Sequence, residues 1–411
     1  MDFNRIAQEF PGTSRKAYLD AACVSITPYS AVTAIKEFLD MALDCKADSS
    51  TQLHLNMDSM RRQALIEAAV FLHTGEENLA LVESTTHGLN LAGRGLPLEP
   101  GSQVLVGEME FLQVAMPWVM MKEQGIEVLQ VPAPGGRVLP EVYEKYITPK
   151  TRLIALSSTS WNNGFHCDIK AFSELCRKHN LYLVVDAIQN LGAVRFYPDE
   201  LDVDVMVSGG HKWLNAPYGC GIMYVSPRVM DEIKPSYWGY LNLEDPEGGW
   251  GTYFSCPDTV GVRPYEEYRF TGSGKKLEIG GTSNYPGAIG LAASLKLVNE
   301  LGHAAVEEHI LSLTDYLMEN LPSSGATLVT VPERANRSGI VSFRFYDDIE
   351  EERALTARLC SEGVLLSIRF TANIGGLRAS CHYFNRQEHL DALLEGLRRA
   401  AKTKAPDYRA S

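Results

Sequence analysis

Between residues 79 and 225, short apolar segments alternate with segments whose apolar residues have helical spacing, and few folds accommodate that alternation. Continuous apolar strands separated by helices are typical of a mostly parallel sheet that helices cover on both faces. The sequence therefore predicts an α/β domain with a mostly parallel, seven-stranded sheet. The predicted strands are 79–82, 103–106, 127–131, 153–157, 182–186, 203–207 and 221–225, and the helices between them begin near 89, 116, 139 and 169.

The flanking regions predict further helices and a second, smaller domain. Residues 1–17 are predicted as an irregular leader before an extended segment at 17–22. Residues 240–276, rich in Gly, Pro, Tyr and acidic residues, are predicted as a long functional loop. From about residue 300, helices and strands form a compact α+β module. The expected helices are 30–46, 56–73, a long one from Pro286, 352–363 and 386–401, and the expected strands are 339–343, 363–367 and 376–380.

This organisation predicts three parts. Residues 1–25 form an N-terminal segment associated with the small domain, 26–290 the large domain, and 291–411 the small C-terminal α+β domain. A chain of 411 residues is long enough for one large domain and a smaller one.

Charge and cysteine pattern narrow the class of protein. A formal net charge of −13 disfavours a nucleic-acid or membrane partner, because either surface would repel the chain. The eight cysteines are scattered without metal-ligand spacing, so we predict no metal site and reduced thiols in a cytoplasmic protein. The N-terminus lacks the apolar segment of a signal peptide, and no apolar run approaches the roughly 20 residues of a membrane span.

Polar side chains that can carry chemistry follow several predicted strands. Residues 84–88 (Ser-Thr-Thr-His-Gly) offer hydroxyls and backbone N–H groups to an anion at a helix start. Asp186 ends an apolar strand, and Gln189 follows it. Lys212 lies in the glycine-rich stretch 208–221, where a shielded amine has a lowered pKa and acts as a nucleophile. Ligands of parallel sheets gather at the carboxyl ends of the strands, so we expect these residues to share one site.

A phosphate-binding loop, a carboxylate and a nucleophilic lysine are the groups that pyridoxal 5′-phosphate requires. The carboxylate keeps the pyridine nitrogen protonated, so that the ring withdraws electrons from the substrate. For the stretch 208–221 alone, a glycine-rich loop with an ordinary surface lysine is the alternative interpretation.

In these motifs the chain resembles the fold-type-I pyridoxal-phosphate enzymes of the class V aminotransferase family, which contains the cysteine desulfurases. The matching stretches follow the family's order along nearly the whole chain: 18–22, 85–90, 185–189, 211–213, 281–282 and 377–380. Residues 161–162, 283–286 and 378–383 are similar to the cysteine and cystine C–S lyases of this family. The resemblance implies pyridoxal phosphate as cofactor, an amino-acid substrate and a homodimer.

The resemblance also implies roles for the residues that bind the cofactor. Lys212 would hold it covalently and move the α-proton of the substrate, Asp186 would pair with the pyridine nitrogen, and Gln189 would contact the phenolic oxygen. The full set of expected cofactor-binding residues is Thr85, Thr86, His87, Phe111, Asn162, Asp186, Gln189, Ser208, His211, Lys212 and Thr282.

Within that set, Thr86, Ser208 and His211 would hold the phosphate, and Thr282 would reach the phosphate in a neighbouring subunit. Asn162 and Arg378 would bind the carboxylate of the substrate. The expected substrate-binding residues are Ala22, Asn162 and Arg378.

Two departures from the family pattern bear on the reaction. Phe111 replaces a histidine that stacks on the cofactor ring, and kynureninases look similar there; a phenyl face can still stack but cannot move a proton. The interval 367–376, where desulfurases carry a nucleophilic cysteine, contains none, and Cys381 beyond Arg378 is interpreted as structural. A desulfurase needs a thiolate to accept the sulfur, so the interval argues against persulfide chemistry.

The expected reaction is therefore an α,β-elimination on an amino acid bound as an external aldimine, similar to that of the C–S lyases and without a catalytic cysteine. An aminotransferase, an epimerase and a kynureninase-like hydrolase share the first steps and stay as alternatives. A non-catalytic binding or scaffold relative is the alternative from another class, and the pair of Lys212 and Asp186 disfavours it.

Overall fold

The computed structural model describes residues 2–255 and 268–403, and its centre is a seven-stranded sheet in the order β2-β8-β7-β6-β5-β3-β4. Six strands of this sheet run in the same direction, and β8 runs antiparallel to its neighbours β7 and β2. The predicted mostly parallel sheet is thus confirmed. The strands are β2 (Leu79–Val82), β3 (Gln103–Gly107), β4 (Glu127–Val131), β5 (Thr151–Ser157), β6 (Tyr182–Asp186), β7 (Val205–Gly209) and β8 (Gly221–Val225).

Successive residues of the central strands alternate between two cores, one on each face of this sheet. In β3, Val104 and Val106 belong to one core and Leu105 to the other. This is why the strands are apolar throughout: a sheet covered on both faces leaves no polar side. The helices of this region are α4 (Thr85–Gly95), α5 (Leu112–Val119), α6 (Pro140–Glu144), α7 (Ile169–His179), α8 (Pro198–Leu201) and α9 (Pro227–Met230).

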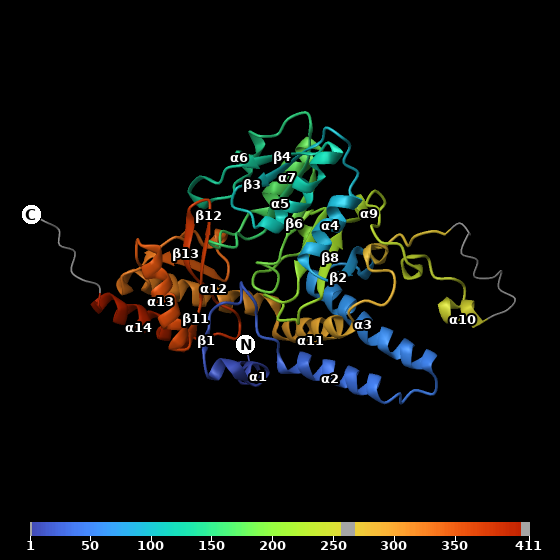
Figure 1. Ribbon diagram of the computed structural model, residues 1–411, viewed down its shortest axis with the longest axis horizontal. Coiled ribbons are helices and arrows are strands. Elements are labelled where there is room, and N and C mark those ends of the chain that lie inside the picture. The colour runs from blue at the N-terminus through green and yellow to red at the C-terminus, as the bar shows by residue number, and fades with distance from the viewer. Residues whose placement is uncertain (1, 256–267, 404–411) are drawn as a thin grey trace, which may run out of the picture.

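Three long helices lie along one edge of the molecule, at the bottom of Figure 1. They are α2 (Tyr29–Leu43), α3 (Ser50–Leu72) and α11 (Tyr285–Leu301), and α11 packs against the other two. Short 3₁₀ turns occur at Pro11–Ser14, Glu76–Asn78, Met120–Gln124, Pro134–Gly136, Tyr240–Asn242, Gly274–Leu277, Pro322–Ser324 and Arg334–Asn336.

The C-terminal lobe, orange to red in Figure 1, is built on an antiparallel sheet in the order β12-β13-β10-β9. Its strands are β9 (Thr327–Leu328), β10 (Ile340–Arg344), β12 (Ser367–Thr371) and β13 (Ile374–Ser380), and its helices are α12 (His303–Asn320), α13 (Ile349–Ser361) and α14 (Gln387–Thr403). A parallel pair, β1 (Ala17–Tyr18) with β11 (Val364–Leu365), joins the N-terminal segment to this lobe. Helix α12 contributes to the cores of both lobes, and the predicted domain boundaries stay a prediction.

Several predicted elements differ from those observed. Residues 1–17 are not irregular: α1 (Phe3–Glu9) begins after Asp2, whose carboxylate accepts hydrogen bonds from the backbone of Asn4 and Arg5. Such a cap, with Ile6 and Phe10 buried one turn apart, stabilises so short a helix. The first helix of the βα region begins at Thr85 and not at Leu89, because the Ser84 side chain caps it.

The predicted loop 240–276 is partly helical, since α10 (Gly249–Ser255) lies within it, and residues 256–267 lie outside the described part. The single strand predicted at 363–367 is divided into β11 and β12, and β12 extends to Thr371 in a hairpin with β13. The two-residue strand β9 carried no sequence signal. In the described part of the chain, no helix is long and apolar enough to cross a membrane.

Candidate active site

A cavity of about 330 Å³, within the range of small-molecule sites, lies where β6 and β7 end. It brings together residues from the N-terminal segment, from the ends of five strands of the large domain (β2, β3, β5, β6 and β7) and from the β12–β13 hairpin. The predicted site residues that line it are Ala22, Thr85, Thr86, Phe111, Asp186, Gln189, His211, Lys212 and Arg378.

Lys212 lies in the turn between β7 and β8, which folds tightly back on itself. The backbone N–H of Gly210 donates to the carbonyl of Cys220 (2.8 Å), and that of Ala216 donates to the carbonyl of Gly210 (2.9 Å). A side chain at Gly210 would meet the Cβ of Ala216 at 2.8 Å, so only glycine fits. Burial lowers the pKa of Lys212 to about 8, against the opposing attraction of Asp186, which makes a free amine accessible near neutral pH.

Asp186, 3% exposed, ends β6 and faces the same cavity. Burial raises its pKa to about 6, although a hydrogen bond from the backbone of Ile188 (2.9 Å, to Oδ1) and the charge of Lys212 act against that rise. Among the described residues, none donates to Oδ2. A buried carboxylate with a free oxygen fits the protonated nitrogen of a pyridine ring.

The first turn of α4 forms another wall of the cavity. Ser84 accepts from the backbone of His87 (3.1 Å), and the hydroxyl of Thr85 accepts from the backbone of Gly209 (2.8 Å), so Thr85 ties α4 to the end of β7. Thr86 is exposed and lines this cavity and an adjoining one of about 420 Å³. Because the N-terminus of an 11-residue helix attracts anions, this corner fits a phosphate group.

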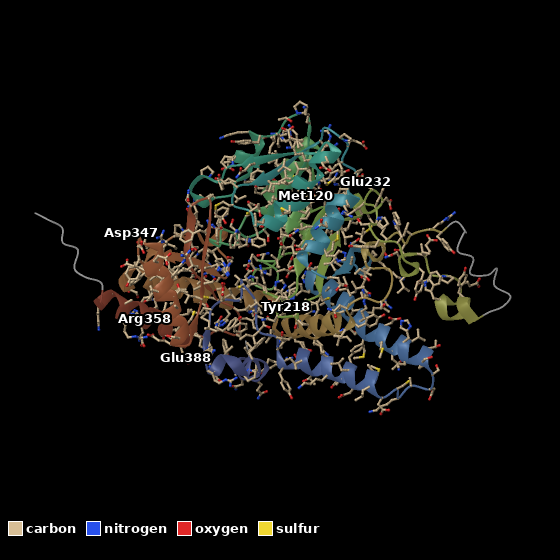
Figure 2. The ribbon with its side chains drawn as sticks, viewed as in Figure 1. Met120, Tyr218, Glu232, Asp347, Arg358 and Glu388 are labelled. Carbon is tan, nitrogen blue, oxygen red and sulfur yellow. The ribbon has the colours of Figure 1, made fainter. Side chains whose placement is uncertain are left out.

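His87 lines the adjoining cavity and not the one that holds Lys212. Its Nδ1 accepts from the backbone of Glu83 (3.1 Å), its buried Nε2 has no partner among the described residues, and burial lowers its pKa. His211 stacks on the exposed ring of Tyr218, with centroids 4.8 Å apart, and Figure 2 labels Tyr218 near the centre of the molecule. Burial, followed by the charge of Lys212, lowers the pKa of His211 to about 4, so it is neutral.

Gln189 links the large domain to the N-terminal segment. Its Nε2 donates to the carbonyl of Ala22 (3.0 Å), and its Oε1 accepts from the indole of Trp213 (3.1 Å). Both ends of the amide are therefore fixed, and the second hydrogen on Nε2 is left for a ligand.

Arg378 on β13 is 1% exposed yet lines the cavity. Its Nη1 donates to the carbonyl of Trp161 (2.7 Å) and its Nη2 to Asp20 (3.1 Å), while Nε has no partner among the described residues. Burial lowers the pKa of Arg378 in spite of Asp20. A guanidinium desolvated to this degree binds a carboxylate strongly when one enters.

Phe111 directly precedes α5 and lines the cavity. Its ring packs edge-on against Trp161 (centroids 5.3 Å apart), and Nζ of Lys212 lies 6.0 Å from its centroid. The preceding Glu110 accepts from the backbone of Ser157 (2.7 Å) and from its hydroxyl, which fixes this corner. Burial raises the pKa of Glu110 to about 7, although both bonds from Ser157 lower it.

Besides His87, three predicted site residues do not line the cavity. Asn162 is fully buried and donates to the carbonyl of Ile374 (2.8 Å), so its amide holds the hairpin instead. Ser208 is 1% exposed, and its hydroxyl donates to the carbonyl of Gly209 (3.2 Å). Thr282 is exposed on the surface. Its predicted contact with a second subunit stays a prediction.

The cavity also contains residues that were not predicted as site residues, although three of them lie in the stretches 84–88, 161–162 and 185–189. They are Cys23, Ser84, Gln113, Trp161, Ile188 and Arg369. The sequence could have indicated two of the others. Cys23 directly follows the matching stretch 18–22, and Arg369 lies on β12, which pairs with the strand of Arg378. Cys381, in contrast, is fully buried, and burial raises the pKa of its thiol to about 12.

Comparisons with known proteins agree with this geometry. The family model described as "Aminotransferase class-V" matches residues 17–393. A probable cysteine desulfurase of Methanothermobacter thermautotrophicus is 26% identical over 96% of this chain and 97% of its own length. A cysteine desulfurase of Escherichia coli O7:K1 is 28% identical over 96% of this chain and 97% of its own length.

Solved structures share the fold. A mutant of C-DES with glycine covalently linked to its PLP cofactor superposes with a TM-score of 0.84 at 24% identity, covering 95% of this chain and 98% of that one. The E. coli cysteine desulfurase CsdA superposes with a TM-score of 0.83 at 20% identity, covering 98% and 99%. The chain therefore belongs to the class V aminotransferase family and is a pyridoxal-phosphate-dependent enzyme of the cysteine desulfurase and C–S lyase type.

Proposed function

We propose that this enzyme cleaves the C–S bond of a cysteine-type amino acid by α,β-elimination. The observation that carries the proposal is the pair of Lys212, with a pKa of about 8, and Asp186, both on one cavity with Arg378. With a pKa of about 8, Lys212 is partly in the free amine form near neutral pH, and that form can remove the α-proton of a substrate. Bound pyridoxal phosphate supplies a ring that withdraws the electrons left behind by that proton.

The residues divide the work of binding and proton transfer. Asp186 would hold the protonated pyridine nitrogen, the first turn of α4 with Thr86 the phosphate, and Gln189 the phenolic oxygen. The ring of Phe111 would cover the face of the cofactor. Arg378 would anchor the carboxylate of the substrate and leave its Cα within reach of Lys212.

The β12–β13 hairpin and a related structure support sulfur as the leaving group. Another solved structure that superposes on this chain is a complex of the cystine C–S lyase C-DES with its reaction product cysteine persulfide (TM-score 0.83, 24% identity). In this chain the hairpin contributes Arg369 and Arg378 to the cavity and no cysteine. Elimination needs no thiol from that hairpin, whereas sulfur transfer to a hairpin cysteine does. We therefore favour cysteine or its disulfide as substrate and pyruvate as product.

We also propose that the enzyme is a cytoplasmic homodimer. Thr282 is exposed on the segment before α11, where it could bind a phosphate only in another subunit, because it does not line its own cavity. The scattered cysteines support a reducing compartment.

A substrate panel tests the reaction. The enzyme with cofactor should convert L-cysteine or L-cystine to pyruvate, ammonia and a sulfur product, detected by mass spectrometry. Lys212→Ala should lower the rate by about 10²- to 10⁴-fold, because that is the usual contribution of a general base. Lys170→Ala, an exposed lysine outside the cavity, is the matched control and should keep the rate. Alanine in place of pyruvate would overturn elimination.

A further inference from the structure

Cys23 lines the cavity that holds Lys212, and it is the one cysteine of the described residues to do so. Its side chain is exposed, although Ala21 and Ala22 before it are buried. From this position we propose that Cys23 accepts a sulfur atom released in the cavity and carries it as a persulfide. The inference rests on the proposed C–S cleavage and adds a second covalent step to it.

Hydrogen bonds on both sides of Cys23 fix its backbone. The N–H of Cys23 donates to the carbonyl of Asp20 (2.9 Å), which closes a turn. The carbonyl of Ala22 accepts from Gln189, and the carbonyl of Val24 accepts from the hydroxyl of Tyr18 (2.7 Å). Cys23 therefore lies on a turn anchored to the end of β6 and is held more firmly than a residue at a free loop tip.

The thiol has a cationic neighbour. Nη2 of Arg369 lies 3.5 Å from Sγ of Cys23, and its Nη1 donates to the carbonyl of Ile368 (2.7 Å). Among the described residues, no carboxylate pairs with Arg369. The guanidinium of Arg369 therefore offers a hydrogen-bond donor to the sulfur of Cys23, in the position where the protein could hold a sulfur group. The buried Nε of Arg378, which has no partner among the described residues, lies on the same cavity and indicates that the cavity is built for a ligand.

The other described cysteines lack this combination. Cys167, Cys176, Cys220 and Cys381 are buried, and burial raises the pKa of each thiol, to about 12 for the last three. Cys360 is half-buried and does not line the cavity, and Cys45 is exposed but lies between α2 and α3, away from the cavity. Cys45 is therefore a matched control, with an exposed thiol and no site.

The sulfur transfer balances without an added oxidant. Elimination from a disulfide amino acid breaks its Cβ–S bond, and the electron pair leaves with the sulfur, which gives a persulfide R–S–SH after one proton is taken up. The thiolate of Cys23 then attacks the outer sulfur. A new S–S bond forms to Cys23, the old S–S bond breaks, and R–S⁻ leaves with its electron pair. One sulfur atom changes carrier, and the negative charge passes from Cys23 to the departing thiolate.

The test is to follow added sulfur on each cysteine. Enzyme loaded with cofactor is mixed with L-cystine, quenched with an alkylating reagent, digested and analysed by mass spectrometry. The peptide with Cys23 should gain the mass of one sulfur atom, in at least about tenfold greater yield than the peptide with Cys45, because Cys23 lies on the cavity where the sulfur is released and Cys45 does not. Cys23→Ser should abolish that label and Cys45→Ser should keep it. Arg369→Gln should slow labelling several-fold.

Further results separate the two proposals. Lys212→Ala should give no label from cystine but should still be labelled at Cys23 by cysteine persulfide supplied from outside. Pyruvate without added sulfur on Cys23 would overturn the role of Cys23 and leave the proposed elimination intact. Alanine with sulfur on Cys23 would support the acceptor and overturn elimination. A whole cysteine on Cys23, joined by a mixed disulfide, would overturn the acceptor.

Discussion

Asp186 destabilises the cofactor-free protein near neutral pH, and the same buried carboxylate is what fits it to bind the cofactor. Burial raises its pKa from 3.8 to about 6, so the folded state holds the proton more tightly than the unfolded state does. That stabilisation is complete below pH 3.8 and is lost as the pH rises through 6. Above pH 6 the buried carboxylate costs about 1–3 kcal/mol, because its pKa lies roughly two units above the value in the unfolded chain even with the attraction of Lys212 included.

We therefore expect Asp186→Asn to stabilise the cofactor-free enzyme at pH 7.5 by about 1–3 kcal/mol, with the gain appearing between pH 4 and 7. The same variant should lose about tenfold to a hundredfold in turnover with cofactor, because an amide cannot hold the pyridine proton. Urea denaturation at several pH values measures the first effect. Asp204→Asn is the contrasting control: this buried carboxylate pairs with Arg177 and Arg228, so its loss should destabilise the fold. An equal loss of stability in both variants would contradict the argument.

Among the elements, the β12–β13 hairpin carries both arginines of the cavity on a strained turn. Ala372 (φ 49°) and Asn373 (φ 61°) both have left-handed backbone conformations. Asparagine tolerates this region, but in alanine the clash of the Cβ with the backbone costs about 1–2 kcal/mol of conformational free energy. The strain sits at an exposed tip, outside the cavity.

Ala372→Gly should raise the free energy of unfolding by about 0.5–1 kcal/mol, since the relief of strain exceeds the added entropy of glycine in the unfolded chain. Asn373→Gly should change it less. Both variants should keep turnover, because neither residue reaches the cavity. A fall in the urea midpoint for Ala372→Gly would show that the turn is not strained.

The elements also explain which parts of the site were predictable. Lys212, Asp186 and Thr86 follow strands of one parallel sheet, and the sheet alone brings strand ends together. Cys23 and Arg369 are 346 residues apart and meet through the pairing of β1 with β11. Strands of two residues leave no recognisable pattern in the sequence, so this contact could not be predicted. Asn162 faces inward because a carbonyl of β13 is there to accept its amide, a contact between lobes that no local pattern contains.

At the scale of the whole molecule, the predicted dimer has a decisive test in mixed subunits. Lys212→Ala and Thr282→Arg should each be nearly inactive alone, the first for lack of the amine and the second because a bulky side chain would enter the partner's phosphate site. In a mixed dimer, one site carries both changes and the other carries neither. Mixing the two variants should therefore restore up to about a quarter of wild-type activity by random pairing. No recovery, with dimers confirmed by light scattering, would place Thr282 outside the partner's site.

The contacts of Asp20 determine when this enzyme can first become complete. Asp20 accepts from Ser367 and from Arg378, which are 347 and 358 residues further along the chain. During synthesis the N-terminal segment is made first, whereas Ser367 and Arg378 are made near the end, long after the central sheet can form. A chain that stops before β12 would keep the sheet core but would lack one wall of the cavity. Premature termination or C-terminal proteolysis should therefore yield cofactor-poor protein and not a partly active enzyme.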